Sequence, residues 1–336
     1  MALEKIKISG IVTLLARLAC LAIALAATAP WAPVQAQNWP MRTVRIIIPY
    51  PAGGGLDVLG RQIANKLATR WGQAVVVENR PGSATFVGAV QVARAEPDGH
   101  TILLTSDSTI SINPYIFAKL PYDPQKDFVP VTNLMFLNFL LTAHRSLQVS
   151  SLSELIALAR AKPGVINYAS YGNGSQPHLI METLKVNTGI NIVHIPYKGG
   201  PQAVLAAVAG EVGLAVSSIP TSLPHVEAGV LKALAFGGTQ RSPHLPNVPT
   251  FAELGYPDVG AYTWYGLFLP AGTPQAVVRR IYQDVNNIMT EPHFRGEQLT
   301  LGYDLVANSP EEFTAYLRAE AESRAKAVRI SGVKMD

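Results

Sequence analysis

The feature that most constrains this chain is a repeated alternation of short apolar, β-branched runs with segments of helical periodicity. Residues 44–48 form one such run, and residues 57–70 place apolar side chains at helical spacing directly after it. The same order recurs along most of the chain. Alternating strands and helices favour sheets that are covered by helices on both faces. The sequence therefore predicts an α/β fold built on mostly parallel sheets flanked by helices.

The units fall into two groups that are separated by proline-rich stretches at 120–124 and 243–257. Such stretches are typical of connections between domains. We therefore expect a first lobe made of residues 37–137 plus 261–336, with a second lobe of residues 138–260 inserted into it. The predicted strands are 44–48, 74–78, 101–105, 139–142, 166–169, 192–195, 212–216 and 231–236. The predicted helices are 57–70, 86–95, 153–161, 178–187, 201–209, 274–289 and 310–329.

The first 36 residues resemble a secretory signal peptide. A short positive segment precedes an apolar stretch from Ile11 to Ala29, and small residues stand at −3 and −1 of a cleavage point after Ala36. We expect removal of residues 1–36 and export to the periplasm. The alternative is an uncleaved membrane anchor, because the apolar stretch is just long enough to span a bilayer. Cys20 lies in this segment, so the mature chain is expected to contain no disulfide.

Composition excludes some classes of function. The net charge is +4 for the full chain and +2 once the charges of the leader are removed, and Lys and Arg do not cluster. This argues against nucleic-acid binding, which requires a basic surface. The mild positive balance is compatible with anionic small molecules. We expect no nucleic-acid partner, no metal and no cofactor.

Two loops that follow predicted strands carry the strongest binding signal. The first, residues 49–57, contains three consecutive glycines and leads into a helix, so backbone N–H groups can approach an anion there. It lacks the lysine of a phosphate-binding loop and the last glycine of a dinucleotide fingerprint. The alternative is a tight turn in which Asp57 only caps the helix. The second loop, residues 170–178, combines hydroxyl and amide groups with two glycines, and its alternative is an Asn-Gly turn followed by a Ser cap.

A third loop at 194–201 carries Lys198, which is either a cation at the mouth of a site or a solvated surface residue. Serines 106 and 217 follow predicted strands, and strand ends line the crevice in open α/β sheets.

Motifs of catalysis are missing from the sequence. It has no Gly-x-Ser-x-Gly turn and no His-Glu-x-x-His pair, and its one cysteine lies in the leader. We therefore expect a binding protein and no catalytic residues.

The order of these motifs resembles the substrate-binding proteins of tripartite tricarboxylate transporters, the Bug family, over nearly the whole mature chain. The motifs that carry the resemblance are Pro49–Gly54 with Asp57 and Arg61, Val77–Gly82, Pro97–Gly99, Leu120–Pro124 with Asp127-Phe128, Tyr171–Ser175 with His178, Pro196–Gly199, and Arg241-Ser242 through Thr250.

The resemblance implies a two-lobed periplasmic binding protein of type II that closes on its ligand. It implies a small carboxylate ligand, such as a dicarboxylate, an amino acid or an aromatic acid, and a membrane permease as partner of a monomeric receptor. Carried onto this chain, it places the ligand between the two loops. The expected ligand-binding residues are Tyr50, Ala52, Gly53, Gly54 and Asp57 on one side, Gly172, Asn173, Ser175 and Gln176 on the other, and Ser106 and Ser217 nearby.

Two departures from the family pattern matter. Leu56 stands where a hydroxyl residue is common, and Ser83–Phe86 replaces a glycine-rich stretch. Both favour a more apolar ligand, and Phe86 is expected near it. Two alternatives stay open: a co-receptor that presents its ligand to a periplasmic sensor domain, and a secreted serine hydrolase that uses Ser175.

Overall fold

The computed structural model describes residues 39–238, 240–300 and 303–335. The predicted signal peptide at 1–36 and its cleavage point lie outside these residues. The elements described here belong to the unit that begins at Pro40. Among the described residues, no helix has the length and apolar character that crossing a membrane requires.

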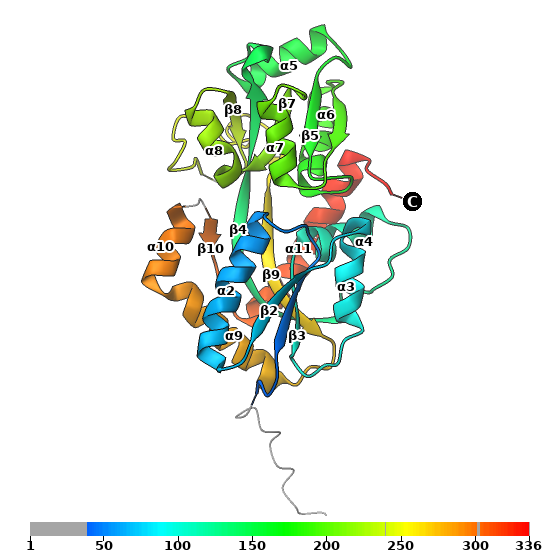
Figure 1. Cartoon of the computed structure of the whole chain (residues 1–336). Coiled ribbons are helices and arrows are strands. Elements are labelled where there is room, and N and C mark those ends of the chain that lie inside the picture. Colours follow the sequence, from blue (N-terminus) through cyan, green and yellow to red (C-terminus); the bar gives the residue numbers. More distant parts are fainter. Residues whose placement is uncertain (1–38, 239, 301–302, 336) are drawn as a thin grey trace, which may run out of the picture. The chain divides into compact units, whose positions relative to one another are not determined.

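One part of the unit is built on six of the described strands, of which β1 to β4 run in one direction and β9 and β10 in the other (Figure 1). The strand order is β2-β1-β3-β9-β4, and β10 also pairs with β4. Because β9 runs against both β3 and β4, strands β1 to β4 share one direction. The bounds are β1 Val44–Ile48, β2 Val75–Asn79, β3 Thr101–Ser106, β4 Phe128–His144, β9 Tyr262–Pro270 and β10 Tyr303–Leu305.

The second part repeats this plan with β6-β5-β7 in parallel. The last residues of β4 pair antiparallel with β7 on one side and with β8 on the other, so β5 to β8 share one direction. The expected α/β fold is confirmed, and most strands of each part share one direction, but five of the nine described strand pairs are antiparallel because β4, β9 and β10 join the sheets. The bounds are β5 Asn167–Ser170, β6 Val193–Pro196, β7 Leu214–Ser218 and β8 Leu231–Phe236.

Helices cover both parts. Those of the first part are α2 Gly55–Trp71, α3 Phe86–Ala93, α4 Asn113–Ile116, α9 Gln275–Thr290, α10 Pro292–Thr300 and α11 Pro310–Ser331, with a π-helix η3 at Ser108–Ile112. Those of the second are α5 Leu152–Ala161, α6 Gln176–Thr188, α7 Gly200–Val208 and α8 Ile219–Glu227. Short 3₁₀ turns occupy Ser83–Thr85 (η2), Arg145–Leu147 (η4) and Pro257–Val259 (η5).

The chain crosses between the two parts within β4 and again just before β9. The backbone N–H of Phe139 donates to the carbonyl of Ala261 at 2.8 Å, so the two crossings are hydrogen-bonded to each other. We propose that these parts are lobe 1 (residues 37–137 and 261–336) and lobe 2 (138–260). Figure 1 shows lobe 2 above lobe 1, with β4 and β9 running between them.

Helix α11 lies on lobe 1 but its end reaches lobe 2. Val328 and Val333 pack in one apolar cluster with Leu179 of α6 and with Ile112 and Ile116 of η3 and α4. The cluster is an apolar contact between the two lobes, near the end of α11 seen in red in Figure 1.

Several elements were not predicted, among them α4, α10 and β10, and three segments were missed for clear physical reasons. Helix α8 contains Pro224 inside it, a residue that removes a helix hydrogen bond. Strand β9 contains Gly266, which sequence rules disfavour in a strand. A Cβ there would lie 2.7 Å from Cζ of Phe313, so the glycine is required for packing. The first half of β4 contains Pro130 and two register shifts, which interrupt the alternation of inward and outward side chains by which a strand is recognised in a sequence.

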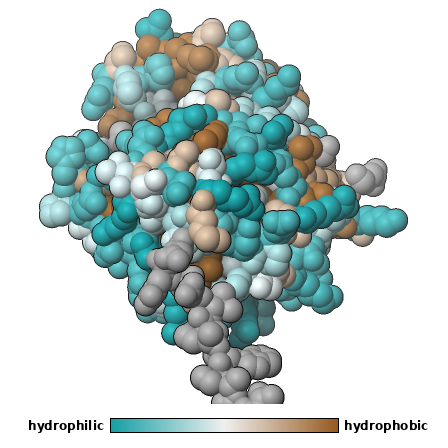
Figure 2. All heavy atoms as spheres, turned by 60° about the horizontal axis from the view of Figure 1, so that its bottom comes forward, coloured by the Kyte–Doolittle hydropathy of each residue, from teal (hydrophilic) through white to brown (hydrophobic). Residues whose placement is uncertain are grey.

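Each lobe has its own apolar core. Trp264, Phe268 and Phe313 lie in that of lobe 1, and Phe139, Tyr168 and Leu184 in that of lobe 2. The end of lobe 1 that faces the viewer in Figure 2 is mainly hydrophilic, with apolar residues scattered over it. Single exposed apolar residues of this kind are normal for a protein surface.

Candidate functional site

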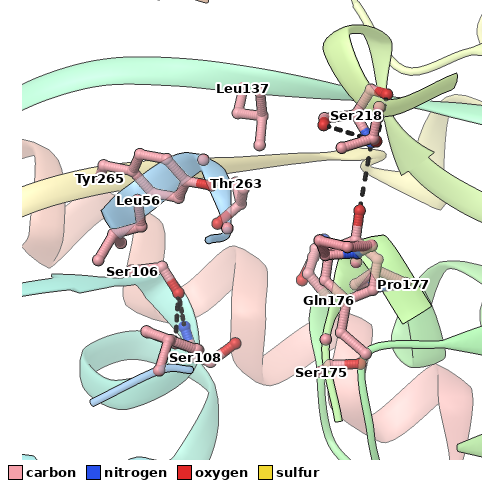
Figure 3. A pocket seen from close by; sticks show the side chains of 18 of the residues that line it. Leu56, Ser106, Ser108, Leu137, Ser175, Gln176, Pro177, Ser218, Thr263 and Tyr265 are labelled. Atoms are coloured by element: carbon pink, nitrogen blue, oxygen red, sulfur yellow. Dashed lines mark hydrogen bonds between the residues drawn. The ribbon is translucent and has the colours of Figure 1, made fainter. Parts of the chain in front are cut away.

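A pocket lies where the loops of the two lobes meet (Figure 3). It encloses about 150 Å³, roughly ten times what a single water molecule needs. Loops that follow β1 and β3 line it from lobe 1, and loops that follow β5, β6 and β7 line it from lobe 2. The two glycine-bearing loops singled out in the sequence therefore contribute to one pocket.

Lobe 1 contributes the start of α2 and a pair of hydroxyl groups. Ala52 and Gly54 line the pocket from the turn that leads into the helix. Tyr50 lines it too, and its hydroxyl is hydrogen-bonded to Oγ of Ser106 at 2.7 Å. Burial raises the pKa of Tyr50, so this hydroxyl stays neutral. Four predicted residues thus lie on this side of the pocket.

Lobe 2 contributes the first residues of three helices. Ser175 and Gln176 begin α6, Gly199 and Gly200 begin α7, and Ser218 precedes α8. Together with the start of α2, four helices of at least nine residues have their N-termini at the pocket.

The first turns of α6, α7 and α8 contain no acidic residue, whereas that of α2 contains the carboxylate of Asp57. Two of the four N-cap residues are glycines, Gly54 and Gly199, and the side chains of the other two, Ser175 and Ser218, accept no hydrogen bond from the backbone of their own helix. Ser175 instead donates its hydroxyl hydrogen to the carbonyl of Gly172 at 2.7 Å. A helix N-terminus carries roughly half a positive charge and unpaired N–H groups, and it therefore attracts anions. Four of them at one pocket favour a negatively charged ligand.

Two charged side chains are found among the lining residues. Lys198 is exposed and lies on the lobe 2 side. Asp107 is fully buried on the lobe 1 side and forms an ion pair with Arg324 of α11 at 3.0 Å. Burial raises the pKa of Asp107 to about 6, although the guanidinium of Arg324 opposes this shift. Lys198 is therefore the cation of this lining that is available to a ligand.

The remaining lining is largely apolar. Leu56, Leu137 and Phe139 contribute aliphatic and aromatic carbon, and the rings of Tyr171 and Tyr265 add to it. Figure 3 shows Leu56, Leu137 and Tyr265 on the same side of the pocket. Leu56 is the residue that stands in place of a hydroxyl in the family pattern, so this departure does reach the pocket.

Two predicted residues of the first loop support the pocket from outside its lining. Gly53 adopts φ +86°, and its N–H donates to the carboxylate of Asp57 at 2.9 Å. Asp57 is buried and also pairs with Arg61 at 3.0 Å. Burial acts to raise the pKa of Asp57, but the hydrogen bonds from Arg61 and Gly53 together outweigh it and hold the pKa below its ordinary value. Both residues shape the turn that places Gly54.

Three predicted residues of lobe 2 also lie outside the lining. Gly172 has φ +120°, and its carbonyl accepts hydrogen bonds from Ser170 and Ser175. Asn173 is exposed. Ser217 is buried and hydrogen-bonded to Ser222, because it lies one residue before the strand end that Ser218 occupies. Strand side chains alternate between faces, so a shift of one residue moves a side chain out of the pocket.

Phe86 does not line the pocket, contrary to the expectation from the sequence. Its ring packs edge-on against Phe117 at 4.8 Å and against Tyr122 at 5.9 Å, within lobe 1. Sequence reasoning missed Leu137, Phe139, Thr263 and Tyr265, which come from the two crossing segments. Leu137, Thr263 and Tyr265 lie outside the predicted strands. Phe139 begins the predicted strand 139–142, but no local signal indicated that this strand reaches the site.

The site lacks the groups that hydrolysis needs. The hydroxyl of Ser175 is bonded to a backbone carbonyl, which cannot take its proton. The nearby His178 accepts from the N–H of Gly174 at 3.1 Å and stacks on His194 at 3.9 Å. Burial and the neighbouring His194 lower the pKa of His178 to about 4. Among the residues that the structure describes, no group of three His, Cys, Asp or Glu side chains is placed to hold a metal ion.

Residues 59–331 match the family described as "Tripartite tricarboxylate transporter family receptor". The chain is similar to Protein BugT of Bordetella pertussis, with 34% identity over 319 residues, 95% of this chain and 98% of BugT. Among solved structures, Rpa4515 of R. palustris with adipate is 31% identical with a TM-score of 0.83, covering 88% of this chain and 99% of that one. MatC of Rhodopseudomonas palustris with bound malate is 29% identical with a TM-score of 0.80, covering 86% and 100%.

The family match covers most of the chain, and the fold agrees with that of solved members over nearly their full length. The chain therefore belongs to the tripartite tricarboxylate transporter receptor family and is a solute-binding protein of the periplasmic type, not an enzyme.

Proposed function

We propose that this protein is a periplasmic receptor that captures a small carboxylate in the pocket between its lobes. It then delivers the ligand to the membrane permease of a tripartite tricarboxylate-type transporter. The signal-peptide pattern at 1–36 supports export, and the family match supports the transporter as partner.

The observation that carries the proposal is the convergence of the N-termini of α2, α6, α7 and α8 on one pocket. Each offers unpaired backbone N–H groups to an anion, and Lys198 adds a full positive charge on the same side as three of them. Solved relatives have been described with adipate and with malate, which supports a carboxylate as the anion.

The two lobes contribute to the pocket from opposite sides, so a bound ligand links them. Closure of two lobes around a ligand is a common way for binding proteins to signal that they are loaded. The ligand stabilises the folded state by mass action, by about 2.7 kcal/mol at one hundred times its Kd.

A thermal-shift screen tests the proposal. Mono-, di- and tricarboxylates, amino acids and aromatic acids are compared with the primary amides of the same acids. We expect at least one carboxylate to raise the Tm in a concentration-dependent way while its amide does not. Equal shifts from acid and amide, or no shift from any acid, contradict carboxylate capture.

Export, oligomeric state and destination are tested separately. The mature protein in a periplasmic fraction is expected to begin at Gln37 and to elute as a monomer in size-exclusion chromatography. Deletion of the gene is expected to abolish uptake of the radiolabelled ligand found in the screen. Unchanged uptake, with loss of a ligand-induced transcriptional response, favours the sensor co-receptor instead.

A further inference from the structure

The hydroxyl hydrogen of Thr263, a residue of the pocket lining, is committed to Asp107. The distance from Thr263 Oγ1 to Asp107 Oδ1 is 2.5 Å, and the carbonyl of Trp264 lies much farther away, at 3.5 Å. Asp107 forms an ion pair with Arg324 at 3.0 Å and is ionised at pH 8, although burial raises its pKa. An ionised carboxylate only accepts hydrogen bonds, so Thr263 must be the donor. The Thr263 oxygen can therefore only accept a hydrogen bond from a ligand.

Gln176 supplies a second acceptor in the same lining. Its Nε2 donates to the carbonyl of Gly260 at 2.8 Å. Because a carbonyl cannot donate, this contact fixes which end of the amide faces Gly260. The other end, Oε1, is buried and has no hydrogen-bond partner among the described residues. A buried acceptor without a partner is costly, and less than 1 Å² of this oxygen is accessible, so a ligand removes that cost only if its donor reaches Oε1 when the pocket adjusts around it.

The charges behind Thr263 also favour a ligand group that donates a hydrogen bond over one that carries a negative charge. Arg324 pairs with Asp107 at 3.0 Å and with Glu320 at 2.9 Å, and all three side chains are at most 4% exposed. Two carboxylates against one guanidinium leave one negative charge in excess. A charge at this depth acts on the pocket with little screening.

We propose that the pocket selects a carboxylate whose far end carries a hydrogen-bond donor, a hydroxyl or an ammonium group, over one whose far end is a second carboxylate. This inference rests on the proposed function. The carboxylate lies at the helix N-termini and Lys198 on the lobe 2 side. The donor lies by the crossing segment, where Thr263 and Gln176 accept from it. A second carboxylate at that point meets lone pairs and an excess negative charge.

Matched acids that differ only in their far end test the selection by calorimetry at pH 8. Hexanoate, 6-hydroxyhexanoate, 6-aminohexanoate and adipate form one series, and the corresponding four-carbon acids form a second. Benzoate with hydroxyl, aminomethyl or carboxylate in the para position forms a third. In the best-binding series, we expect the hydroxyl or ammonium member to bind at least tenfold more tightly than both the methyl (or unsubstituted) and the dicarboxylate members.

Two variants test which residues cause the preference for a hydrogen-bond donor. Thr263→Val keeps the shape and removes the acceptor, so the preference for the donor is expected to fall to about threefold or less. Asp107→Asn removes the excess negative charge while keeping an oxygen that accepts from Thr263, so the dicarboxylate is expected to gain about tenfold relative to the hydroxyl member. Thr273→Val is the matched control, because Thr273 is equally buried, donates to the carbonyl of Pro270 at 2.7 Å, and lies outside the pocket lining.

The outcomes distinguish the proposed selection for a donor from the proposed capture of carboxylates. The proposed selection is wrong if a dicarboxylate binds the wild type most tightly, or if the affinity does not depend on the group at the far end of the acid. Either result leaves carboxylate capture intact. The same holds if Thr263→Val and Thr273→Val change the preference equally. If no series binds, the inference is decided by whether the acid found in the wider screen carries a donor. If no acid binds at all, the proposed function fails and the inference with it.

Discussion

Gly174 in lobe 2 lies against Ile116 of α4 in lobe 1, and a Cβ on Gly174 would overlap Cδ1 of Ile116. Gly174 also has φ +73°, a conformation that other residues rarely adopt. It belongs to the loop that leads into α6, so the contact joins the second loop to the apolar cluster between the lobes. A side chain at this position would require the end of the Ile116 side chain to shift.

Gly174→Ala is therefore expected to weaken ligand binding by about tenfold, because closure would require Ile116 to move. Gly189→Ala is the control: Gly189 has φ +67° at the other end of α6, and nothing lies within 4 Å of its Cβ position. Both variants bear the same backbone strain, roughly 1 kcal/mol. Calorimetric titration with the ligand from the screen measures the affinities. Equal affinities for the two variants would show that the contact with Ile116 plays no part in closure.

Lys198→Gln is expected to lower affinity two- to fivefold at low salt, with most of the effect on the association rate. Lys198 is exposed, and the attraction of such a charge for an anion is screened by salt. Stopped-flow measurements at about 20 and 500 mM NaCl check this, since the difference from wild type should shrink at high salt. Lys162→Gln removes an exposed charge that does not line the pocket, and it should behave as wild type. An effect of Lys198→Gln that survives high salt would instead mean a direct contact.

His178 is expected to make the protein less stable in acid. Its folded pKa is about 4 and its ordinary value is 6.5, so the unfolded chain binds the proton first as the pH falls. The free energy of unfolding should decrease between pH 6.5 and 4, and His178→Gln should reduce that decrease. Urea denaturation at pH 7 and pH 4.5 measures the difference.

His293→Gln is the control for this experiment, because His293 is an exposed histidine on α10. If His178→Gln and His293→Gln show the same dependence on pH, the buried stack with His194 is not the source.

Asp57→Ala is expected to destabilise the protein by about 2 kcal/mol, since it removes a buried carboxylate that accepts from Gly53 and Arg61. It should also weaken binding, because the turn that places Gly54 loses its support. Asn173→Ala should change neither stability nor affinity appreciably, since Asn173 is exposed and outside the pocket lining. Chemical denaturation and calorimetry test both. A large loss of affinity in Asn173→Ala would mean that the loop moves onto the ligand.

Local signals in the sequence determined the α/β class, most strands and helices, and the two loops that carry glycine next to a helix start. Glycine, proline and apolar periodicity act over a few residues, so their effects do not depend on the rest of the fold. These signals singled out the two loops, and the resemblance to the receptor family then implied individual residues, of which Ala52, Gly54, Ser175 and Gln176 line the pocket.

The tertiary structure decided the rest. Leu137, Phe139 and Thr263 reach the pocket only because β4 and β9 cross between the lobes there. Asp107 forms an ion pair with Arg324, more than two hundred residues further along the chain, and no local sequence pattern predicts such a pair. Which side chains share a pocket depends on how distant segments pack, and that information belongs to the whole chain and not to any one stretch of it.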